Sequence, residues 1–437
     1  MHSQYLSYLK ILLKTERLAP DLLWQWQWRQ LERMLRHAAD ETDLYPQRIV
    51  QAFPAGRFDP ARWNDLPVLT RAEAQAAGPA LWARNLPPEA GRSRSAETSG
   101  STGMPLAFGW SDLASTSTRM QMERFWIWHG IDPARTFAEI RVLKQAEALA
   151  PDWQSPHRQG WSIQEDSGLA ASLHVAAPIE RQIAWLSALR PAYLLTYPSH
   201  AVALGQAWRQ AGQMSGPETV ITVGETLDPD QAARIAADLA GAKPARVLDS
   251  YGCQEAGKLA LVCEAGRMHV CAENVHLEIL DEDNQPVAPG MEGWVTITSL
   301  HNFVTPLIRY RLGDRALADD RGPCPCGRSL PVLGRILGRA RNLLVLPDGR
   351  RFWPGNHLAA GMREFVRFRQ FQLVQLAPDL CQLRYVPDPG APPPDLAGLA
   401  AHAQRVLHPR MVIEPVAMTE ITRSPSGKFE DYISLVP

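Results

Sequence analysis

The chain has 437 residues, of which 45% are hydrophobic and 21% charged, and its formal net charge is −1. This composition is ordinary for a globular enzyme, and the length predicts two or three domains. The near-zero charge argues against a nucleic-acid-binding protein, which normally has a basic excess. No apolar run approaches the roughly 20 residues that span a bilayer, and the first residues lack a secretory signal pattern, so we expect a cytoplasmic protein.

Helical patterns fill the start of the chain and lead to an unusual loop. Residues 1–50 predict helices, and residues 71–84 predict another. Residues 97–105 then read Glu-Thr-Ser-Gly-Ser-Thr-Gly-Met-Pro. This segment offers many hydrogen-bond donors and little bulk, which suits a polyphosphate, although similar runs also form plain surface turns. It is not a Walker loop, because Met104 stands where that motif requires lysine.

Short apolar runs alternate with helical patterns in the middle of the chain. Three runs predict buried strands, at residues 192–197, 219–223 and 245–249. The neighbouring patterns predict helices at residues 114–130, 200–211 and 230–239. This alternation predicts a parallel α/β sheet, in which ligands bind at the carboxyl ends of the strands.

The residues that follow the three strands are therefore candidates for a binding site. They are Tyr197, Gly224-Glu225 and Ser250-Tyr251-Gly252. We expect the last group to turn away from its strand, and Ser199 to cap the helix that follows Tyr197.

The pattern changes twice after this sheet. From about residue 262, short antiparallel strands with tight turns are expected, and a third pattern begins near residue 338, with a hairpin at Pro347-Asp348-Gly349. The fold class is therefore predicted to be α/β. A large N-terminal domain over residues 1–337 would hold the parallel sheet and a small β subdomain. A small, mobile α+β domain would occupy residues 338–437.

Three single residues have side chains suited to the same site. Glu255 lies four positions after Tyr251 and could reach a metal at the strand end, although most surface glutamates are only solvated. Asp314 follows two arginines, and its carboxylate suits either the paired hydroxyls of a ribose or a structural ion pair. Lys428 follows a Ser-Pro-Ser-Gly turn near the end of the sequence, where a solvated tail is the plainer interpretation.

Four residues have the chemistry of a structural zinc site. Cys263 and His269 would face each other across a hairpin turn, and Cys324 and Cys326 lie in a proline-containing knuckle. Three thiolates and one imidazole satisfy tetrahedral Zn²⁺ and leave no open position for catalysis. Plain buried cysteines are the alternative. Two more cysteines are the substitutes should one ligand be wrong: Cys253 and Cys271.

In this order, the motifs resemble those of the adenylate-forming superfamily, which includes acyl-CoA synthetases, adenylation domains and luciferases. They are most similar to the phenylacetate–CoA ligase branch, and the likeness runs from about residue 90 to residue 430. It rests on seven motifs: Thr98 to Pro105, Tyr197-Pro198-Ser199, Gly224-Glu225-Thr226, Tyr251-Gly252-x-x-Glu255, Tyr310-Arg311-x-Gly313-Asp314, Gly338-Arg339 and Gly427-Lys428.

The resemblance implies a two-step reaction. A carboxylate, expected to be aryl or arylalkyl, attacks the α-phosphate of ATP to give an acyl-adenylate and pyrophosphate. A thiol, expected to be that of coenzyme A, then takes the acyl group. Because both partners in the first step are anions, fixed positive charge and Mg²⁺ must offset their repulsion. The resemblance implies that Lys428 bridges the carboxylate and the α-phosphate, and that Glu255 ligates Mg²⁺.

The same resemblance implies where the nucleotide lies. The β- and γ-phosphates would be held by the loop residues Thr98, Ser99, Gly100, Ser101, Thr102 and Gly103. The adenine and acyl-phosphate region would be lined by Gly224, Glu225, Thr226, Asp249, Ser250, Tyr251 and Gly252. Asp314 would bind the ribose hydroxyls, with Arg339 close to it.

The chain departs from the family pattern in two places. The usual lysine near the end of the phosphate loop is absent, and the hinge position after Gly-Arg, commonly acidic, falls near Arg341-Asn342. Two alternatives to transfer to coenzyme A are left open. One is transfer of the acyl group to a carrier-protein phosphopantetheine or to an amine. Another is a catalytically degenerate member that binds nucleotide without turnover. The sequence is also compatible with a homodimer.

Overall fold

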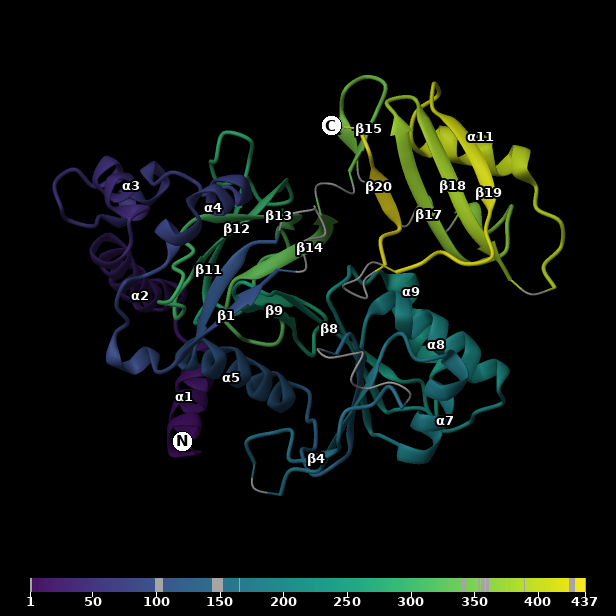
Figure 1. The fold of residues 1–437 in the computed structure, drawn as a ribbon, viewed down its shortest axis with the longest axis horizontal. Coiled ribbons are helices and arrows are strands. Elements are labelled where there is room, and N and C mark those ends of the chain that lie inside the picture. The colour runs from purple at the N-terminus through teal and green to yellow at the C-terminus, as the bar shows by residue number, and fades with distance from the viewer. Residues whose placement is uncertain are drawn as a thin grey trace.

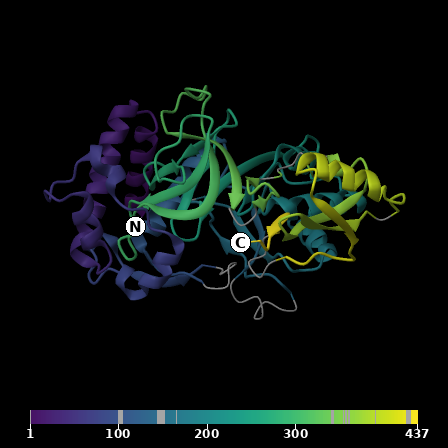
Figure 2. The same cartoon turned by 90° about the horizontal axis from the view of Figure 1, so that it is seen from above.

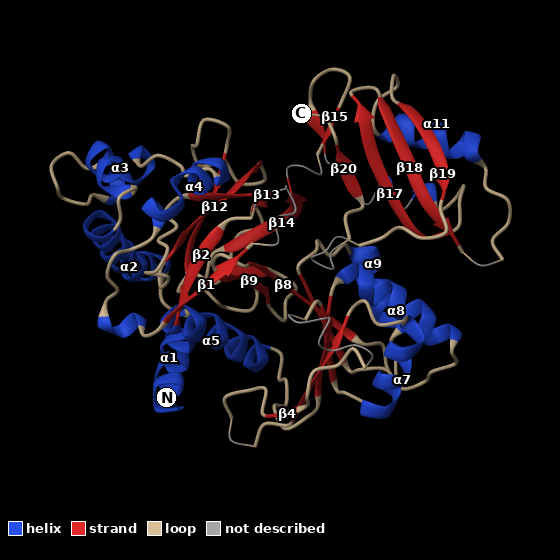
Figure 3. Cartoon of the chain, in the orientation of Figure 1, coloured by secondary structure: helices blue, strands red, loops and turns tan. Residues whose placement is uncertain are grey.

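The computed structural model describes residues 2–98, 105–143, 152–164, 166–339, 343–352, 361–388, 390–423 and 429–436, with Pro354 and Leu358. Two sheets organise them, one of 12 strands and one of four strands near the C-terminus. Strands run through the middle of the molecule and helices lie on the outside (Figure 3). Seen from above, the N-terminal helices and the four-stranded sheet lie at opposite ends (Figure 2).

The predicted helices of the first 130 residues are present. Their bounds are α1 (His2–Thr15), α2 (Pro20–Glu41), α3 (Tyr45–Ala52), α4 (Arg71–Ala77) and α5 (Asp112–Trp128). Thr70 and Glu73 form a capping box at the start of α4, and the Ser111 side chain caps α5. The α4 helix ends earlier than expected, because Gly78 takes a positive φ of 50° and Pro79 follows it.

Five parallel strands form one half of the large sheet, in the order β5-β3-β6-β7-β8. They are β3 (Phe137–Arg141), β5 (Leu169–His174), β6 (Tyr193–Thr196), β7 (Thr219–Val223) and β8 (Arg246–Cys253), and the short β4 (Arg158–Gln159) closes this edge. One face packs against α7 (Ile179–Leu189), α8 (Pro198–Gln210) and α9 (Pro229–Asp238), and the other against α5. The predicted parallel α/β arrangement is therefore confirmed.

Antiparallel strands continue the same sheet beyond β8. They are β9 (Gly257–Val262), β10 (Met268–Val270), β11 (Val275–Leu280), β12 (Glu292–Ser299), β13 (Tyr310–Ala318) and β14 (Val332–Arg339). The prediction that residues 250–252 turn away from their strand is wrong. They stay in β8 because β9 pairs with them, Ser250 opposite Leu261 and Tyr251 opposite Ala260.

The glycine-rich loop and the C-terminal region have sheets of their own. Strands β1 (Ser93–Glu97) and β2 (Ala107–Ser111) pair on either side of the loop. The predicted hairpin joins β15 (Leu344–Val345) to β16 (Arg351–Phe352), with Gly349 at a φ of 83°. The four-stranded sheet contains β17 (Phe368–Ala377), β18 (Leu380–Pro387), β19 (Val412–Ala417) and β20 (Tyr432–Ser434), and α11 (Leu396–Val406) covers it.

The four-stranded sheet has its own apolar core and lies beside α8 and α9 (Figure 1). The division of the chain near residue 338 stays a prediction, and β14 runs to Arg339 within the large sheet. None of the helices in the described ranges combines the length and apolar character that a bilayer-spanning segment requires.

Candidate active site

The carboxyl ends of β6, β7 and β8 lie side by side and gather the predicted strand-end residues. Tyr197, Glu225 and Tyr251 follow or end these three neighbouring strands. Gly224 leaves β7 with a φ of 79°, a conformation that other residues avoid, and so directs Glu225 and Thr226 out of the sheet. This edge is where an open parallel sheet binds its ligands.

Glu225 joins this edge to the C-terminal part of the chain. Its carboxylate accepts hydrogen bonds from the backbone N–H groups of Ser199 (2.9 Å) and Phe429 (2.6 Å). The Arg423 guanidinium lies 3.4 Å from the same carboxylate and donates to Ser199 Oγ at 2.8 Å. The predicted cap at Ser199 is wrong, because α8 begins at Pro198, which has no N–H, and Ser199 offers Glu225 a free backbone donor.

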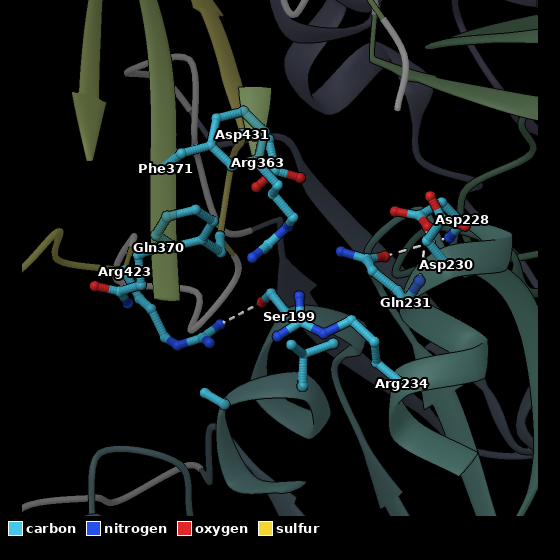
Figure 4. A pocket seen from close by; sticks show the side chains of 13 residues that line it. Ser199, Asp228, Asp230, Gln231, Arg234, Arg363, Gln370, Phe371, Arg423 and Asp431 are labelled. Atoms are coloured by element: carbon cyan, nitrogen blue, oxygen red, sulfur yellow. Dashed lines mark hydrogen bonds between the residues drawn. The ribbon is translucent and has the colours of Figure 1, made fainter. Parts of the chain in front are cut away.

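A pocket beside this contact separates α8 and α9 from the four-stranded sheet (Figure 4). Charged side chains of both signs line it, some from the region of α8 and α9 and some from the C-terminal region: Asp228, Asp230, Arg234, Arg363, Arg423 and Asp431. Burial, with Glu225 and Asp228 nearby, raises the pKa of Asp431 to about 7. Charged side chains from the α8–α9 region and from the C-terminal region thus face one another across this pocket, and the mobility of the C-terminal domain stays a prediction.

Arg71 connects the foot of the glycine-rich loop to Glu255. Its Nη2 donates to Thr98 Oγ1 at 2.7 Å, and its Nη1 lies 3.3 Å from Glu255 Oε1. Thr98 Oγ1 also accepts from the N–H of Leu106, which closes the base of the loop. The side chain of Glu255 is only 8% exposed, so this ion pair is shielded from water.

Arg71 did not emerge from the sequence. Its position at the start of a capped helix is an ordinary place for arginine, and its partners are distant in the chain. The other loop residues of the phosphate-site prediction, Ser99 to Gly103, lie outside the described residues, as do Lys428 and the hinge position Arg341-Asn342.

Asp314 contacts Arg339, which was expected close to it, and also Tyr251, which was not predicted as its partner. The Tyr251 hydroxyl donates to Asp314 Oδ2 at 2.7 Å, and Arg339 Nε lies 3.6 Å from Asp314 Oδ1. Burial and the neighbouring carboxylate raise the pKa of Tyr251 well above its usual value, so its proton stays in place. Asp314 and Arg339 face each other across β13 and β14, and the ribose role of Asp314 stays a prediction.

Asp249 and Ser250 point to opposite faces of β8. Asp249 accepts a hydrogen bond of 2.7 Å from Thr222, on the face that α8 and α9 cover, and burial raises its pKa to about 6. Ser250 lies on the α5 face, where Lys258 Nζ donates to its hydroxyl at 2.9 Å. The pairing of β8 with β9 has a bulge between Tyr251 and Gly252, where Leu259 of β9 is skipped. Lys258 is a second residue at this edge that no sequence motif indicated.

The four predicted zinc ligands come together. The ligand atoms of Cys263, His269, Cys324 and Cys326 all lie within 4.8 Å of one another. The sulfurs of Cys263 and Cys324 are 3.6 Å apart, near the roughly 3.8 Å that two thiolates span on tetrahedral Zn²⁺. His269 Nδ1 bonds the Leu330 carbonyl, which leaves Nε2, 3.2 Å from the Cys326 sulfur, facing the cluster.

Comparison with known proteins agrees with this fold. No protein-family model matches the chain. A segment of 176 residues is 28% identical to a phenylacetate-coenzyme A ligase of Thermus thermophilus and spans 38% of this chain and 38% of that ligase. The match thus covers well under two thirds of that relative's length.

Solved structures match over much more of the chain. A 2-hydroxyisobutyryl-CoA ligase in the postadenylation state, bound to 2-HIB-AMP, has a TM-score of 0.74 at 21% identity, over 96% of this chain and 91% of that chain. In its thioesterification state, with 2-HIB-AMP and CoA, the same ligase has a TM-score of 0.59 at 21% identity and the same coverage. The anthranilate CoA ligase AuaEII with anthranoyl-AMP has a TM-score of 0.54 at 15% identity, over 77% and 65%.

The chain has the fold of the adenylate-forming ligases. The resemblance that its motifs indicated is confirmed at the level of this fold, with acid–CoA ligases among the similar proteins.

Proposed function

We propose that the protein is an AMP-forming acid–thiol ligase that converts a carboxylic acid to an acyl-adenylate and passes the acyl group to coenzyme A. One observation carries the proposal: the N–H of Phe429 bonds Glu225 at the end of β7. Phe429 directly follows Lys428 in the sequence, and its N–H is thus held at the carboxyl edge of the parallel sheet, next in the chain to the lysine expected to act in adenylation. Asp314 joins the same edge through Tyr251 on the neighbouring β8.

The chemistry assigned to these residues is electrostatic. Lys428 would lie between the carboxylate of the acid and the α-phosphate, and Asp314 would orient the ribose. Glu255, nearly buried and offering oxygen ligands, would hold Mg²⁺, which supplies positive charge against the phosphate oxygens. Thr98 to Gly103 would donate to the β- and γ-phosphates, and the residues from Gly224 to Thr226 and from Asp249 to Gly252 would line the rest of the nucleotide site.

The position of the four-stranded sheet relative to the large sheet supports a conformation that serves adenylation, the first of the two reaction steps. The chain superposes better on the postadenylation state of 2-hydroxyisobutyryl-CoA ligase than on its thioesterification state, with TM-scores of 0.74 and 0.59. A second arrangement, reached by rotation of the C-terminal part, would serve the transfer to the thiol. The Glu225 contacts with Phe429 and Arg423 would have to break for that movement.

Coenzyme A is the proposed acceptor because the phenylacetate-coenzyme A ligase and the structural matches are named as CoA ligases. An aryl or arylalkyl acid is proposed as the substrate by analogy with the first of these and with the anthranilate ligase. Transfer to a carrier protein or an amine remains the alternative. The homodimer and the cytoplasmic location stay predictions.

The proposal predicts a lysine-dependent ATP–pyrophosphate exchange. In a panel of acids, at least one should support exchange by the wild type, and Lys428→Ala should lower the rate by at least about a hundredfold without changing the circular dichroism spectrum. Lys10→Ala, at an exposed site on α1, is the matched control and should keep the wild-type rate.

Acyl-CoA formation after coenzyme A is added would identify the acceptor. No exchange by the wild type with any acid would instead support the degenerate alternative, and exchange without acyl-CoA would support a different acceptor.

Arg71 is proposed to supply the positive charge that the missing loop lysine would otherwise provide. It already contacts Thr98 at the base of the loop and Glu255, the proposed Mg²⁺ ligand. Its guanidinium is rigid and always charged, so it can hold the two segments apart at a fixed distance and face phosphate oxygens between them.

Replacing Arg71 should therefore weaken adenylation more than it weakens the fold. Arg71→Met is expected to lower the exchange rate by about a hundredfold and to raise the KM for ATP. Arg62→Met removes an arginine from an exposed ion pair with Asp65 and should stay within about twofold of the wild type. An Arg71→Met enzyme that keeps the wild-type rate and KM would refute this role.

We also propose that Cys263, His269, Cys324 and Cys326 bind a structural zinc ion. Support comes from the four converging ligand atoms and from the hydrogen bond that orients His269. With four protein ligands the ion would tie the β9–β10 hairpin to the loop before β14, away from the reaction itself.

Metal analysis tests this site directly. Protein purified without chelators should contain about one zinc per chain, and Cys326→Ser should lower both the zinc content and the thermal unfolding midpoint. Cys381→Ala, in the core of the four-stranded sheet, should keep the metal. Wild-type protein free of zinc after expression in zinc-supplemented medium would contradict the proposal.

A further inference from the structure

We infer that Lys258 selects the acid: the substrate has a second oxygen acceptor, such as a hydroxyl, carbonyl or carboxylate group, that binds the Lys258 ammonium. This inference rests on the proposed function and narrows its substrate class. It concerns a residue that takes no part in the electrostatic work assigned to Lys428, Arg71 and Glu255.

A bulge between β8 and β9 determines where Lys258 points. Ser250 and Tyr251 pair with Leu261 and Ala260, but after the bulge Gly252 pairs with Lys258. Since side chains alternate along a strand, this shift places Lys258 on the same face as Ser250, whose hydroxyl it contacts. That face also holds Leu248 and Leu261, which pack with Phe125 and Trp126 of α5.

Lys258 therefore lies between the sheet and α5, at the carboxyl end of β8. The next residue after its Ser250 partner is Tyr251, whose hydroxyl bonds Asp314, the proposed ribose ligand. With the ribose at Tyr251, the acyl end of an adenylate would extend along the same strand end. A side chain beside Ser250 is thus placed to meet the acyl group rather than the adenosine.

The structure describes no negatively charged partner for the ammonium of Lys258. Within the described residues it donates to Ser250 at 2.9 Å and forms no ion pair with a carboxylate. An ammonium has three donors, so further acceptors are needed. Burial lowers the pKa of Lys258 to about 8, which leaves it mostly protonated at neutral pH. A desolvated cation of this kind gains most from an acceptor that enters with a ligand.

A polar atom on α5, close to Lys258, has no hydrogen-bond partner among the described residues. Thr118 Oγ1 is buried and, in the part of the chain that the structure describes, makes no hydrogen bond. It lies against Gly257, next to Lys258, since a Cβ built on that glycine would be 2.1 Å from Thr118 Oγ1. Between α5 and β9, two neighbouring polar groups, the Lys258 ammonium and the Thr118 hydroxyl, can therefore form further hydrogen bonds with a ligand.

The choice of lysine is informative in this chain. Only six of its 45 basic residues are lysines. Lysine presents a compact point charge on a flexible stem, whereas arginine presents a broad fork. At Lys258 the compact group fits beside Ser250 and can turn its remaining donors toward a small ligand.

Paired acids test the inference. Exchange kinetics would be measured for phenylacetate against hydroxyphenylacetates, benzoate against hydroxybenzoates and hexanoate against adipate, with the wild type, Lys258→Met and Lys258→Arg. The wild type should prefer the oxygen-bearing member of at least one pair. Lys258→Met should lower that preference by at least about tenfold through the KM for the acid, and Lys258→Arg should restore part of it.

Lys243→Met, in an exposed loop, is the matched control and should leave the preference unchanged. Calorimetric binding of the same acids to the wild type and to Lys258→Met gives a readout that does not need turnover. Comparison of the hydroxyl-bearing acids with adipate shows whether a hydroxyl or a carboxylate is the preferred acceptor.

The outcomes separate the two proposals. Exchange by the wild type without any preference for an oxygen-bearing acid, or an equal loss of kcat for all acids in Lys258→Met, would overturn the role of Lys258 and leave the ligase function standing. Lysine-dependent binding of oxygen-bearing acids without exchange would support the role of Lys258 and overturn the ligase function.

Discussion

The Glu225 carboxylate is the contact on which the functional account depends. It accepts one hydrogen bond from the N-terminus of α8 and one from Phe429, far along the chain, and it faces Arg423. Through this acceptor, the segment that follows Lys428 in the sequence is bonded to the carboxyl edge of the parallel sheet. The parallel sheet supplies the edge, and Gly224 supplies the turn that exposes Glu225 there.

Under the proposed ligase function, charge accounts for the arrangement of the surrounding residues. An acid and ATP repel each other, so a site that joins them needs cations held in place before the reactants arrive. Arg71 is held by Thr98 and Glu255 from opposite sides, and Lys428 would come from the C-terminal part only when that part is docked. Asp431 and Arg363 line the pocket between this part and α8 and α9, and the mobility of this part stays a prediction.

Local sequence patterns predicted the order of the secondary-structure elements and several of the candidate site residues. The order of strands and helices followed from alternating apolar runs, and the convergence of the four cysteine and histidine side chains followed from residue type and spacing. These features depend on neighbours in the sequence or on a strong chemical preference, so they are readable from the chain alone.

Contacts between segments that are distant in the chain could not be predicted from the sequence. Arg71 looked like an ordinary helix residue because its partners, Thr98 and Glu255, lie in other elements. Lys258 changes face through a bulge that no residue pattern marks. The strand end at Ser250 was misjudged because pairing with β9 outweighed the local preference of Ser-Tyr-Gly for a turn. The placement of Ser199 depended on the missing N–H of Pro198 and on a distant glutamate.

The most direct measurement is a crystal structure of the protein with an acyl-sulfamoyl adenosine, a stable analogue of the acyl-adenylate. The account predicts that the Lys428 ammonium lies within hydrogen-bonding distance of the sulfamoyl group, with Phe429 still bonded to Glu225 and the ribose on Asp314. An analogue bound away from the ends of β7 and β8, or a Lys428 side chain that cannot reach it in any docked arrangement, would contradict the account.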